Sequence, residues 1–101
     1  MKNFTNLQPT VTENYVKLLP AKPNTVIASI GFDNEGQKLI IKFQTGRVYQ
    51  YYSSLMCDFI NLVESPQPGV DFNLYIKDNY QYAEVDGIVY TKNNFEYVLP
   101  D

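Results

Sequence analysis

The sequence predicts an α+β fold: a small antiparallel sheet covered on one face by one main helix and a second short helix. Residues 27–52 alternate as three strands joined by two tight turns. The chain then changes to a helical spacing of apolar residues that ends at Pro66. The tail alternates again around Asp86-Gly87. We therefore expect a three-strand meander plus a C-terminal hairpin.

A chain of 101 residues is long enough for one domain with its own core. We expect an N-terminal extension over residues 1–23, a central domain over 24–80, and a β-hairpin extension over 81–101 packed on the same domain. The first segment contains three prolines, and residues 15–19 could form an edge strand within it.

The turn around Gly46 sets the register of the central hairpin. If Thr45 and Gly46 are its two loop residues, Lys42 pairs with Tyr49. The side expected to face water then carries Lys38, Ile40, Lys42, Arg47, Tyr49 and Tyr51. The side expected to face the core carries Leu39, Ile41, Phe43, Val48, Gln50 and Tyr52. If the pairing of one strand shifted by one residue, every side chain of that strand would move to the opposite face of the sheet.

The strand before this hairpin covers residues 26–32 and contains the small residues Ser29 and Gly31. A glycine inside a strand indicates either a bulge or the close approach of another segment.

Two helices are expected after the sheet. Ser53 or Ser54 could cap the first, and Asp58 would lie in its first turn. Its apolar stripe comprises Leu55, Met56, Phe59, Ile60, Leu62 and Val63. Asp71 could cap the second helix, which would place Phe72, Ile76 and Tyr80 on one face and Asn73 beside Lys77. Those two polar residues either satisfy backbone groups, which we favour, or lie near the tyrosines as part of a site.

The tail predicts a hairpin in which Asp86-Gly87 joins residues 82–85 to residues 88–90. Asn93 and Asn94 could turn the chain once more into a last strand over 95–99. These strands would either extend the sheet at an edge or cross the tyrosine face and bury it.

The central residues resemble the KTSC domain, over about residues 24–80. The resemblance lies in Ile27-x-x-Ile30-Gly31-Phe32-Asp33, in Leu39-x-Ile41-x-Phe43-x-x-Gly46-x-Val48-Tyr49-x-Tyr51, and in Phe72-Asn73-x-x-Ile76-Lys77-x-x-Tyr80. This family is named after the C-terminal extension of some lysyl-tRNA synthetases and includes small stand-alone proteins of bacteria and phages. The resemblance implies that Tyr49 and Tyr51 match the family's central tyrosine-x-tyrosine, and RNA binding has been suggested for the family.

Composition argues against several classes of function. The chain has no histidine, so the commonest acid–base group and zinc ligand are missing, and we expect no enzyme activity, metal or cofactor. The single cysteine, Cys57, is expected to be buried and inert. No apolar run reaches the ~20 residues that span a membrane. Without a hydrophobic leader, we expect a cytoplasmic protein, in the host cytoplasm if it is phage-encoded.

Two binding functions remain. The first is a module for RNA, single-stranded nucleic acid or a nucleotide, with rings that stack bases and cations that contact phosphate. Its candidate ligand-binding residues are Tyr49, Tyr51, Lys42, Arg47, Lys38, Asn73 and Lys77. The alternative is a protein–protein interaction module, for example a small phage-encoded inhibitor of a host factor, because tyrosine often anchors interfaces. The net charge of −3 limits nucleic-acid contact to a local patch. A plainer interpretation is that the tyrosines only pack within strands, which their propensity favours.

Overall fold

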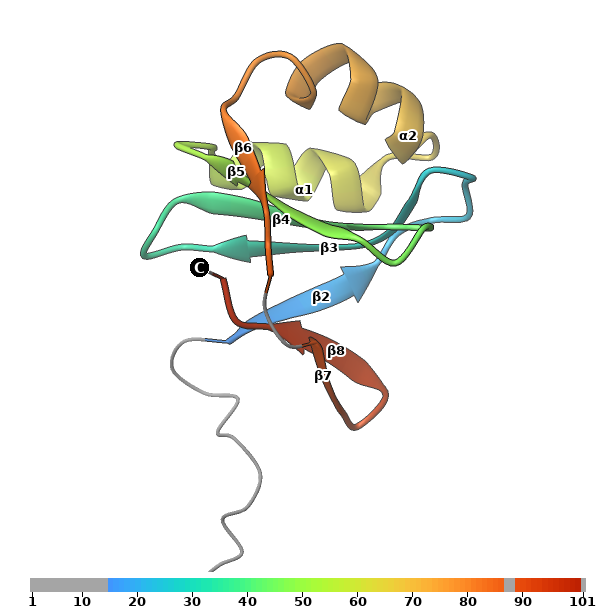
Figure 1. Cartoon of the computed structure of the whole chain (residues 1–101). Coiled ribbons are helices and arrows are strands. Elements are labelled where there is room, and N and C mark those ends of the chain that lie inside the picture. Colours follow the sequence, from blue (N-terminus) through green and yellow to red (C-terminus); the bar gives the residue numbers. More distant parts are fainter. Residues whose placement is uncertain (1–14, 87–88, 101) are drawn as a thin grey trace, which may run out of the picture.

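The computed structural model describes residues 15–86 and 89–100 and confirms the α+β class. Its elements are β2 (Val16–Pro20), β3 (Ile27–Asp33), β4 (Lys38–Phe43), β5 (Val48–Tyr52), α1 (Met56–Glu64), α2 (Pro68–Asp71), the π-helical segment η1 (Phe72–Ile76), β6 (Tyr82–Glu84), β7 (Val89–Lys92) and β8 (Phe95–Val98). The strands form one antiparallel sheet in the order β6-β5-β4-β3-β2-β8-β7. Figure 1 shows α1 and α2 on the β3–β5 side of this curled sheet, while β2, β8 and β7 curl away below.

The β3–β4–β5 meander lies inside a larger sheet than the sequence predicts. The expected edge strand, β2, is an interior strand: Leu19 and Pro20 pair with β3, whereas Val16 to Leu18 pair with β8. Gly31 of β3 makes this packing possible, because a Cβ atom there would lie 2.7 Å from the carbonyl oxygen of Lys17 in β2. Of the two alternatives for Gly31, a bulge or the close approach of another segment, the structure shows the close approach.

The predicted register of the β4–β5 hairpin is wrong by one residue. The loop has three residues rather than two: the N–H of Phe43 donates to the Arg47 carbonyl, and the N–H of Gly46 donates to the Phe43 carbonyl. Gly46, at φ +96°, ends this loop, and Tyr49 pairs with Ile41. The extra loop residue exchanges the faces of β5 relative to β4.

The corrected register turns the tyrosine pair toward the helices. Tyr49 and Tyr51 share a face with Leu39, Ile41 and Phe43. The opposite face carries Lys38, Ile40, Lys42, Val48, Gln50 and Tyr52.

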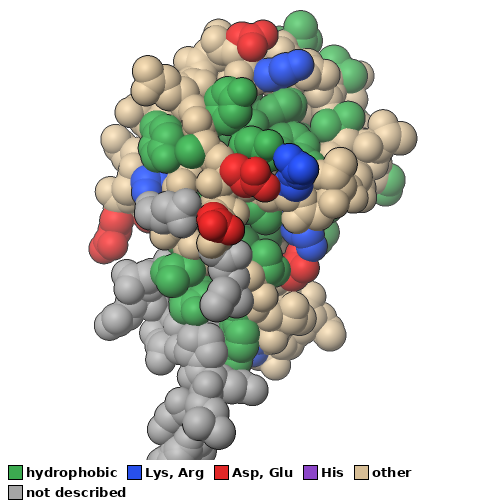
Figure 2. Space-filling model, viewed as in Figure 1, with side chains coloured by type: hydrophobic (Ala, Val, Ile, Leu, Met, Phe, Trp, Pro, Cys, Tyr) green, Lys and Arg blue, Asp and Glu red, His purple; other side chains and the backbone are tan. Residues whose placement is uncertain are grey.

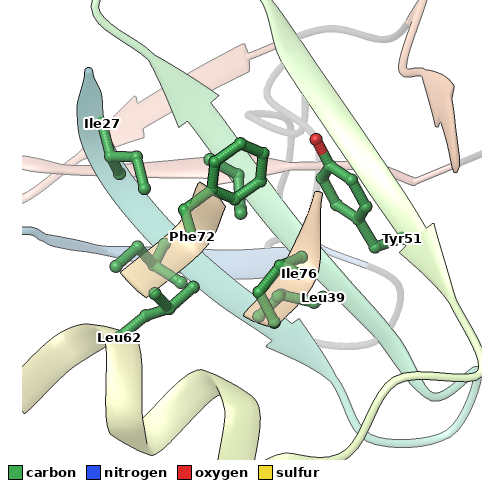
Figure 3. Packing of buried hydrophobic residues seen from close by; sticks show 8 residues of the cluster. Ile27, Leu39, Tyr51, Leu62, Phe72 and Ile76 are labelled. Atoms are coloured by element: carbon green, nitrogen blue, oxygen red, sulfur yellow. The ribbon is translucent and has the colours of Figure 1, made fainter. Parts of the chain in front are cut away.

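Two hydrophobic cores lie on the two faces of β4. The first is sandwiched between the sheet and the helices and contains Ile27, Ile30, Leu39, Ile41, Tyr51, Leu62, Phe72 and Ile76. In Figure 3 the ring of Tyr51 lies beside that of Phe72 in this layer. The second core lies on the other face and contains Val16, Leu18, Ile40, Val48, Val85 and Val98. The curled strands therefore cover the face that was expected to meet water.

The helices differ from the predicted ones mainly at their N-termini. Neither Ser53 nor Ser54 caps α1; the hydroxyl of Ser54 donates to the Tyr51 carbonyl, and Asp58 accepts the N–H of Leu55 at 3.1 Å. Within the predicted stripe, Leu62 is buried, while Leu55, Met56 and Ile60 are exposed. Cys57 is exposed as well, against the expectation of a buried thiol.

The second helix begins at Pro68, earlier than the predicted cap at Asp71, because proline suits a first helical turn. It continues through the π-helical segment, in which the N–H of Lys77 donates to the Phe72 carbonyl.

The predicted Asp86-Gly87 hairpin is wrong. β6 pairs with β5 and β7 pairs with β8, so the two strands lie at opposite ends of the sheet. Gly87 and Ile88 themselves lie outside the described residues. The second predicted turn is confirmed, since Lys92 pairs with Phe95 across Asn93 and Asn94, which both have positive φ. The tail thus extends both ends of the sheet.

In the described ranges, 15–86 and 89–100, no helix has the length and apolar character needed to cross a membrane.

Candidate ligand-binding groove

A groove of about 510 Å³ opens between the β4–β5 hairpin, the end of η1 and β6. Five aromatic side chains line it: Phe43, Tyr49, Tyr51, Phe72 and Tyr82. Three charged side chains line it as well: Arg47, Lys77 and Asp78. Figure 2 shows hydrophobic side chains gathered between the helical layer and the β5–β6 edge, with basic side chains on both sides of them. We call this site the aromatic groove.

The five rings contact one another in a closed cycle, which we call the ring cluster. The centroid distances are 5.6 Å for Phe43–Tyr49, 5.8 Å for Tyr49–Tyr82, 5.6 Å for Tyr82–Tyr51, 5.7 Å for Tyr51–Phe72 and 5.3 Å for Phe72–Phe43. Phe43 meets Tyr49 and Phe72 at 81° and 75°, which are edge-to-face contacts. Such pairs add ~0.5–1.5 kcal/mol each beyond the area that they bury. The cluster therefore stabilises the wall of the groove as well as shaping it.

The ring cluster passes from the core to the surface. Tyr51 and Phe72 are each only 4% exposed, Phe43 and Tyr49 are half-buried, and Tyr82 is 58% exposed. Burial raises the pKa of Tyr51 above its ordinary value of 10, and the nearby Tyr82 and Tyr49 add to this effect. Tyr51 is thus neutral at physiological pH, and the ring most accessible to a ligand is Tyr82.

Two cations at the groove are available to a ligand. Arg47 follows the hairpin loop, and Lys77 follows η1; both are exposed. Neither side chain makes an ion pair or hydrogen bond with another residue in the described part of the chain. Asp78, next to Lys77, contributes one negative charge, so the charged lining sums to +1.

The structure separates the predicted site residues into two groups. Tyr49, Tyr51, Arg47 and Lys77 all line the aromatic groove. The proposed outward orientation of the two tyrosines is wrong, however, because the three-residue loop turns both toward the helical layer.

The remaining candidates lie elsewhere. Lys42 is on the opposite face of the sheet, where its Nζ lies 2.7 Å from a carboxylate oxygen of Glu96. Lys38 shares that face, with its Nζ 5.8 Å from the ring centroid of Tyr52. Asn73 is exposed on η1 and does not line the groove. The predicted grouping of Lys38 and Lys42 with the tyrosines is therefore wrong.

Sequence reasoning missed Phe43, Phe72 and Tyr82 as groove residues. The first two were expected to be core residues only, and Tyr82 was expected to lie in a separate hairpin. A three-residue loop ending at a positive-φ glycine is the alternative that would have placed Phe43 beside Tyr49.

These features define a small α+β domain with a curled antiparallel sheet, helices on one face and an aromatic groove at the sheet edge. Residues 23–80, more than half of the chain, match the KTSC domain family, and the chain belongs to that family. The match includes β3, β4, β5 and both helices, whereas β2 and β6–β8 lie outside it.

A solved structure supports the same fold. The crystal structure of a KTSC domain protein from Yersinia pestis superposes with a TM-score of 0.64 at 24% sequence identity. The alignment covers 69% of this chain and 97% of that one. A search of curated proteins found none that matches this sequence.

Proposed function

We propose that this protein is a non-enzymatic binding domain that holds a base of RNA, single-stranded nucleic acid or a nucleotide in the aromatic groove. One observation carries the proposal: Tyr82 and Tyr49 line the same groove as Arg47 and Lys77. Rings that stack on bases and cations that meet phosphates are the combination used to bind single strands.

The charge of the lining favours an anionic ligand over a cationic one. Aromatic clusters also attract quaternary ammonium or guanidinium groups through their ring faces. Here a cationic ligand would lie beside both Arg47 and Lys77, and only Asp78 would attract it. A phosphate group instead gains two attractive partners that have no competing ion pair among the described residues.

Substitution of Tyr82 tests this proposal. Tyr82→Ala should weaken binding of a fluorescently labelled single-stranded RNA about tenfold in an anisotropy titration, because stacking contributes ~1–3 kcal/mol per base. Tyr82 is a better position than Tyr51 for this substitution, because truncating the buried Tyr51 would leave a cavity in the core and destabilise the fold.

Tyr75→Ala is the matched control, since Tyr75 is 61% exposed but does not line the aromatic groove. Equal affinities for the Tyr82→Ala and Tyr75→Ala proteins would contradict the proposal, as would the absence of binding to any nucleic acid or nucleotide.

A protein partner is a second candidate, favoured by the apolar residues that the helical layer exposes. These residues are Leu55, Met56, Ile60, Val70, Leu74 and Tyr75. A partner with an apolar interface should resist nuclease and high salt. Its capture should be lost on Leu74→Ser but unchanged on Tyr82→Ala.

A further inference from the structure

We infer that the aromatic groove accepts one nucleotide unit, a single base with a terminal phosphate monoester, rather than a run of successive nucleotides. This inference rests on the proposed function and specifies its ligand. The unit could be a free mononucleotide or the phosphorylated end of a strand, and both share the same chemistry.

The ring cluster leaves room for one stacked base. In its closed cycle the rings cover one another, and Tyr51 and Phe72 are almost fully buried. Tyr82 has the largest exposed fraction of the five rings and also contacts Tyr49 and Tyr51. A platform for successive bases needs several exposed ring faces in a row. Here Tyr82 supplies the main stacking face, and the half-buried Tyr49 and Phe43 border it.

The size of the groove agrees with a single unit. At about 510 Å³ it lies within the ~300–1,000 Å³ typical of small-molecule pockets. It is bounded by the β4–β5 loop on one side and by β6 on the other.

The charges limit the number of phosphates. Arg47 and Lys77 are the basic side chains among the groove-lining residues. Close by, β6 carries the exposed Glu84, which pairs with Tyr49, and the exposed Asp86 follows it. Phosphates of a longer strand that left past β6 would approach these carboxylates on a protein of net charge −3.

A terminal phosphate matches the two cations better than an internal one. A phosphate monoester carries about −1.5 to −2 charges at neutral pH, whereas an internal diester carries a single charge. Two basic side chains without ion-pair partners in the described residues therefore neutralise a monoester almost completely. Asp78 opposes the ligand slightly, so its neutralisation should strengthen binding.

The test measures affinity against ligand length and phosphorylation by competition with a labelled 5′-phosphorylated RNA tetranucleotide. Its probes are adenosine, adenosine monophosphate, and oligoadenylates of four and twelve nucleotides with and without a 5′-phosphate. We expect the monophosphate to bind at least about tenfold more tightly than adenosine, because charge-assisted phosphate contacts are strong. The phosphorylated tetramer and dodecamer should have equal affinities within about threefold, with a salt slope near −1.4 for two contacts.

Variants assign the effect to the groove. Arg47→Ser and Lys77→Ser should each weaken the binding of adenosine monophosphate and leave the affinity for adenosine nearly unchanged. Asp78→Asn should strengthen the binding of adenosine monophosphate. Lys92→Ser, at an exposed lysine of β7 outside the groove, is the matched control. It should change neither the affinity for adenosine monophosphate nor that for adenosine.

The outcomes separate the inference from the function on which it rests. The single-unit inference is overturned if the affinity rises steadily with the length of the oligonucleotide. It is also overturned if the affinity does not depend on the terminal phosphate but still depends on Tyr82. In both cases the proposed function stands. If no probe binds, both are overturned. If the free monophosphate binds well and the phosphorylated oligomers bind at least about tenfold more weakly, the ligand is a mononucleotide and not a strand end.

Discussion

Tyr80 and Asp58 form a single hydrogen bond that joins two parts of the helical layer. The hydroxyl of Tyr80, which follows η1, donates to a carboxylate oxygen of Asp58 in the first turn of α1 at 2.6 Å. The same oxygen accepts the N–H of Leu55. This hydrogen bond, with further contributions from burial and from the negative charge of Asp58, raises the pKa of Tyr80 to about 12.

The raised pKa predicts how stability depends on pH. The folded protein holds the Tyr80 proton more tightly than the unfolded chain, where the pKa is near 10. The stabilisation from this group is thus fully present below about pH 10 and is lost as the pH rises through about 12. The free energy of unfolding, measured with urea at intervals from about pH 9 to about pH 12, should fall less steeply for Tyr80→Phe than for the unmodified protein.

Part of the slope should persist in that variant, because burial raises the pKa of Tyr51 in the same direction. The control is Tyr75→Phe, which removes a hydroxyl from an exposed ring. Identical pH slopes for Tyr80→Phe and Tyr75→Phe would show that the hydrogen bond contributes nothing measurable.

Among the elements, the β4–β5 hairpin shows what sequence can and cannot specify. The alternating residues on both sides of Gly46 are enough to predict two paired strands. They do not specify the register, because a positive-φ glycine suits both a two-residue loop and a three-residue loop. The longer loop turns Tyr49, Tyr51 and Phe43 toward the helices, with Gln50 on the other face. This one-residue choice decides which cations accompany the tyrosines.

The same ambiguity explains why only part of the groove could be predicted. Arg47 was identified from its place on the predicted tyrosine face, and Lys77 from its place beside Asn73 on the predicted second helix; both line the groove. Tyr82 could not be assigned to the groove, because its strand, β6, pairs with β5, about thirty residues earlier in the chain. Local sequence patterns do not encode a pairing over that distance. The Asp86-Gly87 signal favoured a different partner for that strand.

The contact between β2 and β3 makes Gly31 a sensitive position. A Cβ atom there would lie 2.7 Å from the Lys17 carbonyl oxygen and 2.8 Å from side-chain carbons of Leu18 and Val16. Both strands are interior and cannot separate without losing backbone hydrogen bonds. Gly31→Ala should therefore lower the free energy of unfolding by ~1–3 kcal/mol or more, measured by urea denaturation.

Gly36→Ala provides the comparison for this prediction. Its nearest atom, at 2.6 Å, is one carboxylate oxygen of Asp33, the last residue of β3. The other oxygen of that carboxylate accepts the N–H groups of Glu35 and Gly36 at 3.2 Å. That side chain can rotate away at the cost of these two exposed hydrogen bonds, whereas the Lys17 carbonyl beside Gly31 belongs to the backbone of an interior strand, so the loss of stability should be smaller for Gly36→Ala. Equal losses for the two variants would mean that β2 moves freely over β3.

At the scale of the whole molecule, β4 ties the two hydrophobic cores together. Its neighbouring residues Ile40 and Ile41 are both completely buried, the first in the second core and the second in the first core. β2 provides a further link, since it pairs with both β3 and β8. The pairing of Val16 with Val98 joins the two ends of the described chain. No local sequence signal could predict it, which is why the sheet was expected to be smaller.

The shared strand predicts that both cores unfold together. Leu18 is buried in the second core, far in sequence from the ring cluster, and Leu18→Ala should cost ~2–5 kcal/mol. Far-ultraviolet circular dichroism reports on the whole sheet, whereas the aromatic proton signals of Tyr51 in nuclear magnetic resonance spectra report on the first core. If β4 couples the cores, both signals should shift to lower urea by the same amount and remain coincident. Leu99→Ala, at a leucine that is 37% exposed, should shift both signals much less than Leu18→Ala does. Two separated transitions would instead show that β2, β7 and β8 unfold as an independent unit, and a change in that unit would then leave the aromatic groove intact.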